Sequence, residues 1–225
     1  MRFLLRCVAV IVSETLFRAD RYRLSRLVGR GLKIGRNVYI MENVMFDYGY
    51  PYLIEIGDHC RISREVRILA HDATPFRDLG VTRLAPVRIL EGTFIAERAV
   101  ILPGVTLGPR AMVAAGAVVN RSFPEGAMVA GNPARMYASF DDYLERVRAD
   151  ARDTVRIPKE EIESGRVTPA DVARMLESRE AVFVHGVPRR DRFYVNADME
   201  EIRSRAGRVF AEAFGAPPER PPSES

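Results

Sequence analysis

The chain has 225 residues, enough for one large domain or for one domain with an appendage. Its net charge of +4 comes from 34 Lys and Arg against 30 Asp and Glu, a small basic excess that favours small anionic ligands. There is no zinc-finger spacing and no basic run alternating with aromatic residues, so we expect no nucleic-acid function. The two cysteines, Cys7 and Cys60, suggest neither a disulfide framework nor a metal site, and a reducing cytoplasm is the natural location.

Residues 1–30 are predicted to form a helical cover for one end of the domain that follows. An irregular helical pattern runs through residues 3–28, and Gly29 and Gly31 would end the helix. The apolar run near the start is too short to span a bilayer, and Arg6 interrupts it. The alternative is a peripheral membrane contact at the N-terminus, since arginines flank the apolar face.

Residues 31–138 carry an apolar period of six, clearest between residues 89 and 124. An amphipathic helix repeats about every 3.6 residues and a half-buried strand about every two, so this period requires another architecture. Hexapeptide repeats build a parallel β-helix, in which three repeats make a triangular coil of about eighteen residues. The large apolar positions, each followed four residues later by a mostly small side chain, are Ile89, Ile95, Ile101, Leu107, Val113 and Val119.

The same period appears upstream, with two interruptions. Ile34 and Ile40 begin one series, and Ile56, Ile62 and Ile68 form another. The interruptions span residues 46–55 and 73–88. We interpret both as loops pushed out of the coil, because a repeat accepts insertions without losing its stacked core.

Residues 139–215 are predicted to be a helical C-terminal extension. Helical spacing occurs over 140–148 and 197–214, residues 168–171 supply a hydroxyl N-cap and a proline that begin another helix, and 181–184 suggest a short strand. The extension caps the last coil, extends a subunit interface or covers an acceptor site, and the sequence leaves these roles open. Residues 216–225 are rich in Pro, Glu and Ser and are predicted to be disordered.

His71 is the candidate general base among the three histidines. It is the third residue after Ile68, a place that faces outward at a coil corner, and it adjoins the longer interruption. A histidine has an ordinary pKa of about 6.5, which suits proton removal from a hydroxyl at neutral pH. His59 holds the same place in its own repeat with no interruption beside it, so it serves as a control, and His185 is expected to be structural.

Candidate ligand contacts come from the first interruption and from the neighbour of His71. Asp47 and Asp72 could accept hydrogen bonds from the hydroxyls of a ligand, and Tyr48 or Tyr50 could stack on a ligand ring. Asp72 and Glu65 could each orient His71 through its other ring nitrogen, and both stay open.

The sequence resembles the left-handed β-helix acyltransferases, especially the sugar and xenobiotic O-acetyltransferases, over residues 95–106, 113–121 and 129–135. The resemblance covers roughly residues 31–138. It implies a mainly β fold, a left-handed parallel β-helix of hexapeptide repeats with an N-terminal helix and an α-rich C-terminal extension. It also implies an acyl-CoA co-substrate, most simply acetyl-CoA, no metal, a homotrimer with sites between subunits, and a catalytic histidine at the position of His71.

The resemblance further implies where the donor binds: the family's positions fall on Ala115, Asn120 and Arg121, with Arg135 near the nucleotide. The Arg121 guanidinium suits a phosphate. The chain departs from the family pattern at Glu97, Ala138 and Asp47, where a small polar residue, a basic residue and an asparagine are common, so those contacts must differ.

The sequence is compatible with three classes of function. The first is O-acetylation of a sugar hydroxyl on a surface polysaccharide, a lipopolysaccharide or a glycosylated metabolite, with a histidine base. The second is N-acetylation of an amino sugar nucleotide. The third is a non-catalytic β-helix scaffold, because a fold by itself does not establish an activity.

Overall fold

The computed structural model describes residues 19–152, 156–158, 183–185 and 193–214. The chain divides into two compact units. The first, Met1–Phe140 with Phe193–Asn196, contains a parallel β-helix and every candidate site residue. The second is Asp141–Arg192 with Ala197–Ser225.

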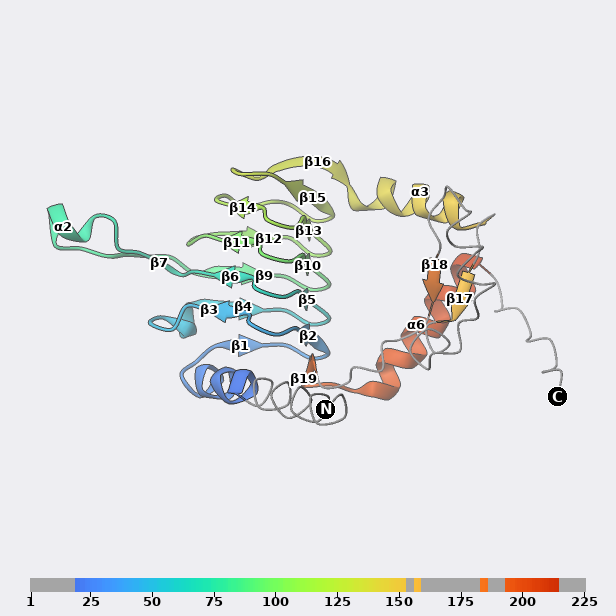
Figure 1. Cartoon of the computed structure of the whole chain (residues 1–225), viewed down its shortest axis with the longest axis horizontal. Coiled ribbons are helices and arrows are strands. Elements are labelled where there is room, and N and C mark those ends of the chain that lie inside the picture. Colours follow the sequence, from blue (N-terminus) through green and yellow to red (C-terminus); the bar gives the residue numbers. More distant parts are fainter. Residues whose placement is uncertain (1–18, 153–155, 159–182, 186–192, 215–225) are drawn as a thin grey trace, which may run out of the picture. The chain divides into compact units, whose positions relative to one another are not determined.

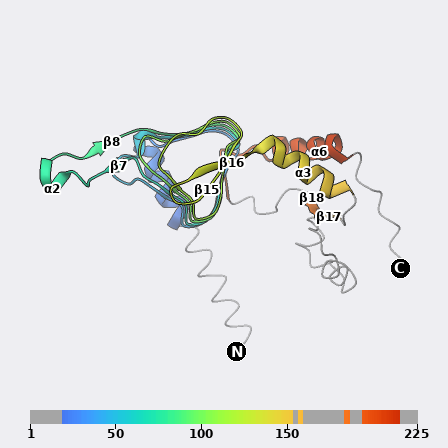
Figure 2. The same cartoon turned by 90° about the horizontal axis from the view of Figure 1, so that it is seen from above.

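Three sheets of short parallel strands form the sides of the first unit, and successive coils stack on one another (Figure 1) around a triangular outline (Figure 2). Each turn of chain visits the three sheets in the same order. The first sheet contains β1 (Lys33–Ile34), β4 (Ile54–Ile56), β9 (Val87–Ile89) and β12 (Thr106–Leu107). The second contains β2 (Val38–Ile40), β5 (Arg61–Ile62), β10 (Phe94–Ile95), β13 (Met112–Val113) and β15 (Ala127–Ala130). The third contains β3 (Met45–Phe46), β6 (Arg67–Ile68), β11 (Val100–Ile101) and β14 (Val118–Val119).

The core of the β-helix consists of the residues that the period of six selects. Ile95, Ile101 and Leu107 are 0% exposed, and the smaller residues between them, Ala99 and Val105, are also buried. One of the small positions is polar: the buried Thr93 hydroxyl donates a hydrogen bond to the Gly108 carbonyl at 3.0 Å. The predicted β-helix and its core are therefore confirmed.

Cys60 also occupies an inward small-residue position, four residues after Ile56. Its side chain is buried, and burial raises the pKa of the thiol to about 11. A thiol with so high a pKa is a small apolar side chain at neutral pH rather than a nucleophile.

The first interruption begins one residue later than predicted and ends sooner. Phe46 is buried in β3, opposite Ile68, so it holds the inward place six residues after Ile40. After Phe46 the chain leaves the coil for residues 47–53, which end in the short 3-10 helix η1 (Pro51–Leu53), and it re-enters the coil in β4. We call residues 47–53 the small loop.

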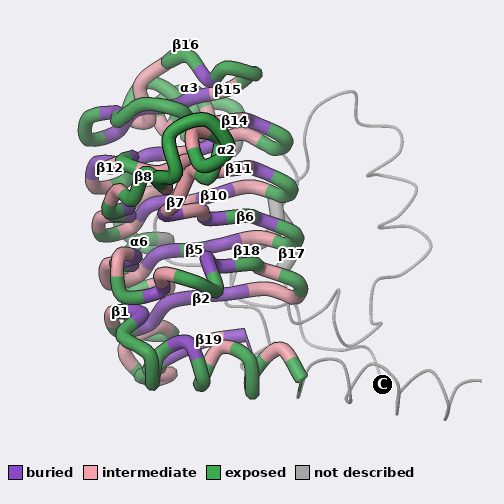
Figure 3. Tube along the Cα trace, turned by 90° about the vertical axis from the view of Figure 1, so that its left-hand side faces the viewer, coloured by how far each residue is buried: buried purple, intermediate pink, exposed green. Residues whose placement is uncertain are grey.

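The second interruption is a hairpin, where we predicted a loop. Strand β7 (His71–Asp72) pairs antiparallel with β8 (Arg83–Leu84), and α2 (Phe76–Leu79) forms the tip. Residues 71–84, here called the arm, project from one corner of the triangle (Figure 2) and are largely exposed (Figure 3). The Ala85 amide donates to the Ala70 carbonyl at 3.0 Å and closes the base of the arm. His71 is therefore the first residue of the arm, which corrects its predicted place at a coil corner.

The two ends of the second sheet are closed by antiparallel strands. At one end β16 (Arg135–Ser139) pairs with β15. At the other end β19 (Tyr194–Val195) pairs with β2, and Asn196 donates its side-chain amide to the carbonyls of Ile34 and Gly35 at 3.0 Å. These two antiparallel strands become the edges of the sheet, so the parallel strands β15 and β2 no longer have an open edge. The sequence did not predict β19.

Residues 19–29 are helical and cover the first coil, which confirms the described part of the predicted N-terminal helix. Residues 3–18 of that prediction lie outside the described residues. No helix among the described residues is both long and apolar enough to cross a membrane.

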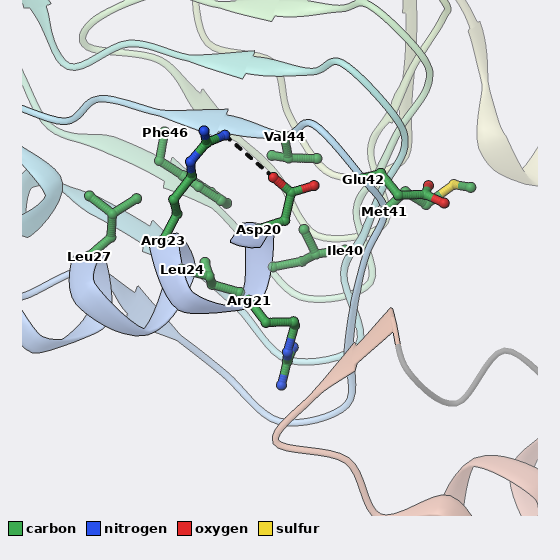
Figure 4. Close-up of a pocket in the computed structure, with 10 residues that line it drawn as sticks. All are labelled: Asp20, Arg21, Arg23, Leu24, Leu27, Ile40, Met41, Glu42, Val44 and Phe46. Atoms are coloured by element: carbon green, nitrogen blue, oxygen red, sulfur yellow. Dashed lines mark ion pairs between the residues drawn. The ribbon is translucent and has the colours of Figure 1, made fainter. Parts of the chain in front are cut away.

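A small pocket lies between this helix and the first coil (Figure 4). Its floor is apolar, and Asp20 and Arg23 form an ion pair at its rim, 3.6 Å apart. The lining includes neither His71 nor Asp47. The residues that line it are Asp20, Arg21, Arg23, Leu24, Leu27, Ile40, Met41, Glu42, Val44 and Phe46.

The second unit contains two described helices and a pair of strands. Helices α3 (Phe140–Arg152) and α6 (Met199–Phe214) confirm the helices predicted over 140–148 and 197–214. The predicted strand at 181–184 is found as β18 (Phe183–His185), which pairs in parallel with β17 (Arg156–Pro158). The helix predicted from residue 168 and the disorder predicted for 216–225 lie outside the described residues.

Candidate active site

The stacking of the third sheet brings Asp47 next to His71. β3 and β6 are neighbouring strands, and the Asp47 amide donates to the Ile68 carbonyl at 2.8 Å. The residues that follow these two strands therefore meet at one edge of the β-helix. Asp47 Oδ2 lies 2.5 Å from His71 Nδ1, although the two residues are 24 apart in the sequence.

The Asp47 carboxylate is completely enclosed, with a side-chain exposure of 0%. Oδ1 accepts hydrogen bonds from the amides of Gly49 at 3.0 Å and Tyr50 at 3.2 Å, and Oδ2 accepts from the Ala70 amide at 2.9 Å as well as from His71. Burial acts to raise the pKa of Asp47, but the hydrogen bonds from His71 and from the Ala70 and Tyr50 amides outweigh it and lower the pKa. Asp47 is thus an ionised carboxylate at neutral pH.

This partner determines which nitrogen of His71 can act as a base. An ionised carboxylate only accepts hydrogen bonds, so Nδ1 must carry the proton and the lone pair of the neutral ring is on Nε2. The His71 side chain is 37% exposed and makes no other hydrogen bond with the described residues. The geometry leaves Nε2 available to a proton donor from outside the chain.

Two expectations about carboxylates near His71 are wrong. Asp47 was expected to contact the acceptor, but its oxygens are enclosed and engaged in four hydrogen bonds. Asp72 and Glu65 were the candidates to orient His71. Instead, Asp72 accepts a hydrogen bond from the Thr74 amide at 2.9 Å, and Glu65 pairs with Arg98 at 2.7 Å. Asp47 orients the ring because coil stacking, and not sequence proximity, determines what lies beside it.

The tyrosines of the small loop differ in their surroundings. The Tyr50 ring lies 5.3 Å from the His71 ring, centroid to centroid, and is half-buried against the core. Tyr48 is 64% exposed, with the Arg30 guanidinium 4.7 Å from its ring centroid. Tyr50 therefore supports the His71 ring, whereas Tyr48 presents an aromatic surface to solvent.

His59 lies at another edge of the β-helix. It follows β4 of the first sheet and turns the corner with a φ of 58°, as do other third-place residues such as Asn37 and Arg98. His71 has instead left the coil for β7. Since the two histidines occupy different edges and conformations, His59 is a suitable control for His71. His185 lies in β18 of the second unit.

The predicted donor residues fall on two edges. Asn120 and Arg121 follow β14, so they share the edge of His71, two coils further along the third sheet. Ala115 follows β13 at the edge between the second and third sheets, and Arg135 is opposite Ala130 at the same edge. One chain thus brings Asn120 and Arg121 to the His71 edge but places Ala115 and Arg135 at another.

The side chains of these donor candidates are accessible. Ala115, Asn120, Arg121 and Arg135 are all exposed. The Arg121 guanidinium lies 5.2 Å from the Phe123 ring centroid, and Arg135 donates to the Ala134 carbonyl at 2.9 Å. Stacking on a ring leaves the donors at the rim of a guanidinium able to reach an anion.

Comparison with known proteins gives the family. A family model described as bacterial transferase hexapeptide (six repeats) matches residues 86–121. YvoF of Bacillus subtilis (strain 168), a protein assigned as an acetyltransferase, is 32% identical over 120 residues, which are 53% of this chain and 67% of that protein. The chain belongs to the hexapeptide-repeat acetyltransferases. Its parallel β-helix is the left-handed β-helix of that family.

Other members of the hexapeptide-repeat acetyltransferases match more weakly. Galactoside O-acetyltransferase from Escherichia coli (strain K12) is 29% identical over 117 residues, which are 51% of this chain and 57% of that protein. The hexapeptide-repeat-containing acetyltransferase VCA0836 from Vibrio cholerae has 24% identity and a TM-score of 0.44, over 54% of this chain and 81% of that one. The chain thus spans between 57% and 67% of the two sequence relatives named.

Proposed function

We propose that this acetyltransferase moves the acetyl group of acetyl-CoA to a hydroxyl of a saccharide, with His71 as the general base. The observation that carries the proposal is the bond between His71 Nδ1 and the enclosed Asp47 carboxylate, 2.5 Å long, which leaves Nε2 as the basic nitrogen. The saccharide class is supported by the name of the galactoside O-acetyltransferase relative. A surface polysaccharide, a lipopolysaccharide or a glycosylated metabolite would each supply such a hydroxyl.

The reaction needs one proton to move twice. His71 Nε2 accepts the proton of the acceptor hydroxyl while the oxygen attacks the thioester carbonyl carbon. The new C–O bond forms, the C–S bond breaks, and the proton passes from His71 to the departing thiolate of coenzyme A. While the ring is protonated, the negative charge of Asp47 stabilises it, and the hydrogen bond to Nδ1 holds its orientation.

Residues at the His71 edge and at the Ala115 edge supply the proposed binding surfaces. Tyr48 presents its ring for an acceptor sugar, and Asp72 lies beside His71 in β7. Arg121 and Asn120 would bind the donor on the same edge as His71. Small side chains around Ala115 would leave room for the pantetheine arm, and Arg135 would lie near the nucleotide.

The separation of the donor candidates over two edges supports a homotrimer. If three copies pack around an axis, the His71 edge of one copy can face the Ala115 edge of the next, and a single acetyl-CoA can contact both. Neighbouring copies would then share each active site. A cytoplasmic location goes with an acetyl-CoA donor.

The test is release of coenzyme A from acetyl-CoA in the presence of simple sugars, oligosaccharides and amino sugar nucleotides. His71→Ala should lower kcat by about 10²- to 10⁴-fold, the usual contribution of positioned proton transfer, with little change in acetyl-CoA affinity. His59→Ala is the control and should match wild type. Equal rates for wild type and His71→Ala would overturn the assignment of the base. A preference for amino sugars would indicate N-acetylation, and no turnover with any acceptor would favour a scaffold.

A further inference from the structure

Arg30 reaches from the end of the N-terminal helix to the small loop beside the active site. It is the first residue after the helix of residues 19–29. Its Nη1 donates to the Tyr48 carbonyl at 2.7 Å, and its Nη2 lies 3.4 Å from the Gly49 carbonyl. Its guanidinium carbon lies 4.7 Å from the Tyr48 ring centroid. One side chain thus holds two consecutive carbonyls and one ring of the small loop.

The same short segment is held from the inside by Asp47. The Gly49 amide donates to Asp47 Oδ1 at 3.0 Å, and the Tyr50 amide donates to the same oxygen at 3.2 Å. The peptide units of residues 48–50 therefore lie between the Arg30 guanidinium, which binds their carbonyls, and the Asp47 carboxylate, which binds their amides. A movement of this backbone would displace Asp47 Oδ1. It would therefore also displace Oδ2 of the same carboxylate, which accepts the hydrogen bond from His71.

The backbone beside Arg30 also packs against the far end of the small loop. Gly31 has a φ of 99°, and a Cβ added there would lie 2.8 Å from the Tyr52 Cβ. Only glycine tolerates both this conformation and this approach. The helix end thus contacts the small loop near both of its ends.

Arginine suits this position for reasons of shape. Its planar fork can donate to two carbonyls at once while its face stacks on an aromatic ring, whereas a lysine ammonium is a single point of charge. The exposed Tyr48 side chain shows that the outer surface of the small loop faces solvent. Water could replace the hydrogen bonds of Arg30, but it could not restrain the position of the backbone.

We propose that Arg30 is a positioning residue for the reaction: it fixes the small loop so that Asp47 holds His71 in the orientation that catalysis needs. The inference rests on the proposed function, because it assumes that His71 is the base. It assigns the N-terminal helix a part in catalysis beyond covering the first coil. The competing explanation is that Arg30 only fastens the helix to the coil, which would affect stability alone.

The test compares Arg30→Gln and Arg30→Lys with the control Arg26→Gln. Arg26 is exposed and lies about one turn before Arg30, inside the helix of residues 19–29, and the contacts with the small loop described above come from Arg30 instead. Arg30→Gln should lower kcat about tenfold or more, as expected for a break in a coupled network, with the KM for acetyl-CoA within about twofold of wild type. Arg30→Lys should recover part of the loss, and Arg26→Gln should match wild type.

A double-mutant cycle with Asp47→Asn asks whether Arg30 acts through Asp47. If it does, Arg30→Gln should change kcat by less than about twofold in the Asp47→Asn background. The ¹⁵N spectrum of the His71 ring gives a readout that needs no acceptor. Wild type should show the proton on Nδ1, and both Arg30→Gln and Asp47→Asn should raise the population with the proton on Nε2.

Two results would overturn the inference. One is a lower melting temperature for Arg30→Gln with wild-type kcat and a wild-type His71 spectrum, which would make Arg30 a fastener only. The other is a double variant in which kcat falls by the product of the factors measured for Arg30→Gln and for Asp47→Asn alone. Full activity in His71→Ala would instead refute the proposed base, and the ring spectrum would still decide whether Arg30 positions His71. If Arg30→Gln does not fold, Arg30→Lys carries the same comparisons.

Discussion

Replacing Asp47 with asparagine tests the central contact of the site while keeping the shape of the side chain. The substitution turns one acceptor oxygen into an amide that donates. In the wild type, Oδ1 accepts hydrogen bonds from the amides of Gly49 and Tyr50, and Oδ2 accepts hydrogen bonds from the Ala70 amide and from His71 Nδ1. If the new NH2 group takes the place of Oδ1, it meets two backbone amides and loses two hydrogen bonds. If it takes the place of Oδ2, it loses the bond from the Ala70 amide and can bind His71 Nδ1 only when the ring proton moves to Nε2.

The size of the effect follows from these contacts. A buried group without its partner costs about 1 to 3 kcal/mol, and the small loop can relax, so we expect a loss of about 2 kcal/mol in the free energy of unfolding. For a chain of this length, that loss lowers the melting temperature by roughly 4 to 8 °C. The kcat should fall by about 10²- to 10⁴-fold, because the ring loses both its orientation and the charge that stabilises its protonated form.

The assay is coenzyme A release together with thermal unfolding followed by circular dichroism. Glu65→Gln is the matched control, because Glu65 is one of the two carboxylates predicted to orient His71 and pairs with the exposed Arg98 instead. It should leave kcat unchanged. Wild-type kcat and melting temperature in Asp47→Asn, or an equal loss of kcat in Glu65→Gln, would refute the assignment of Asp47.

The same variant has a predictable pH dependence. The pKa of Asp47 is lowered from its ordinary value of 3.8, so its contribution to stability is complete above that value and is lost as the pH falls through the lower folded pKa. The difference in melting temperature between wild type and Asp47→Asn should therefore not decrease between neutral pH and about pH 5, and should be lost only in more acidic solution. A difference that already vanishes near pH 6 would contradict this account.

Three further predictions concern the donor, the coil and the assembly. Arg121→Ala should weaken acetyl-CoA binding by about 1 to 3 kcal/mol in calorimetry without unfolding the protein, and unchanged affinity would reject the phosphate contact. Gly108→Ala should destabilise the fold by about 1 to 3 kcal/mol in thermal unfolding, since its Cβ would lie 2.4 Å from Glu125 N and from the Pro124 carbonyl carbon. Gly29→Ala, whose Cβ would meet nothing within 4 Å, should not destabilise the fold, and equal melting temperatures for the two variants would count against the backbone contact. Light scattering should return the mass of a trimer at micromolar concentration, and a monomer mass would reject the shared active site.

The sequence predicted the β-helix because its signal is local and repeats. Each large apolar residue six places from the last meets the same environment, and Ile95, Ile101 and Leu107 are accordingly all 0% exposed. The prediction was wrong in detail at the two interruptions, where the period of six is broken. The predicted first interruption included Phe46, although its place six residues after Ile40 was an available signal for the buried position that it holds. The antiparallel pairing of β7 with β8 has no counterpart in the period and could not be read from it.

By itself, the sequence determined the architecture, the inward face of each coil and the choice of His71 as the candidate base. Only the tertiary structure decided what lies beside His71. Asp47 is 24 residues earlier, Arg30 contacts a carbonyl 18 residues away, and Asn196 binds a carbonyl 162 residues away. The physical reason is that a period of six describes a one-dimensional pattern of burial. Which side chains meet at an edge of the β-helix depends instead on how many residues leave the coil at each interruption and on which strands then stack.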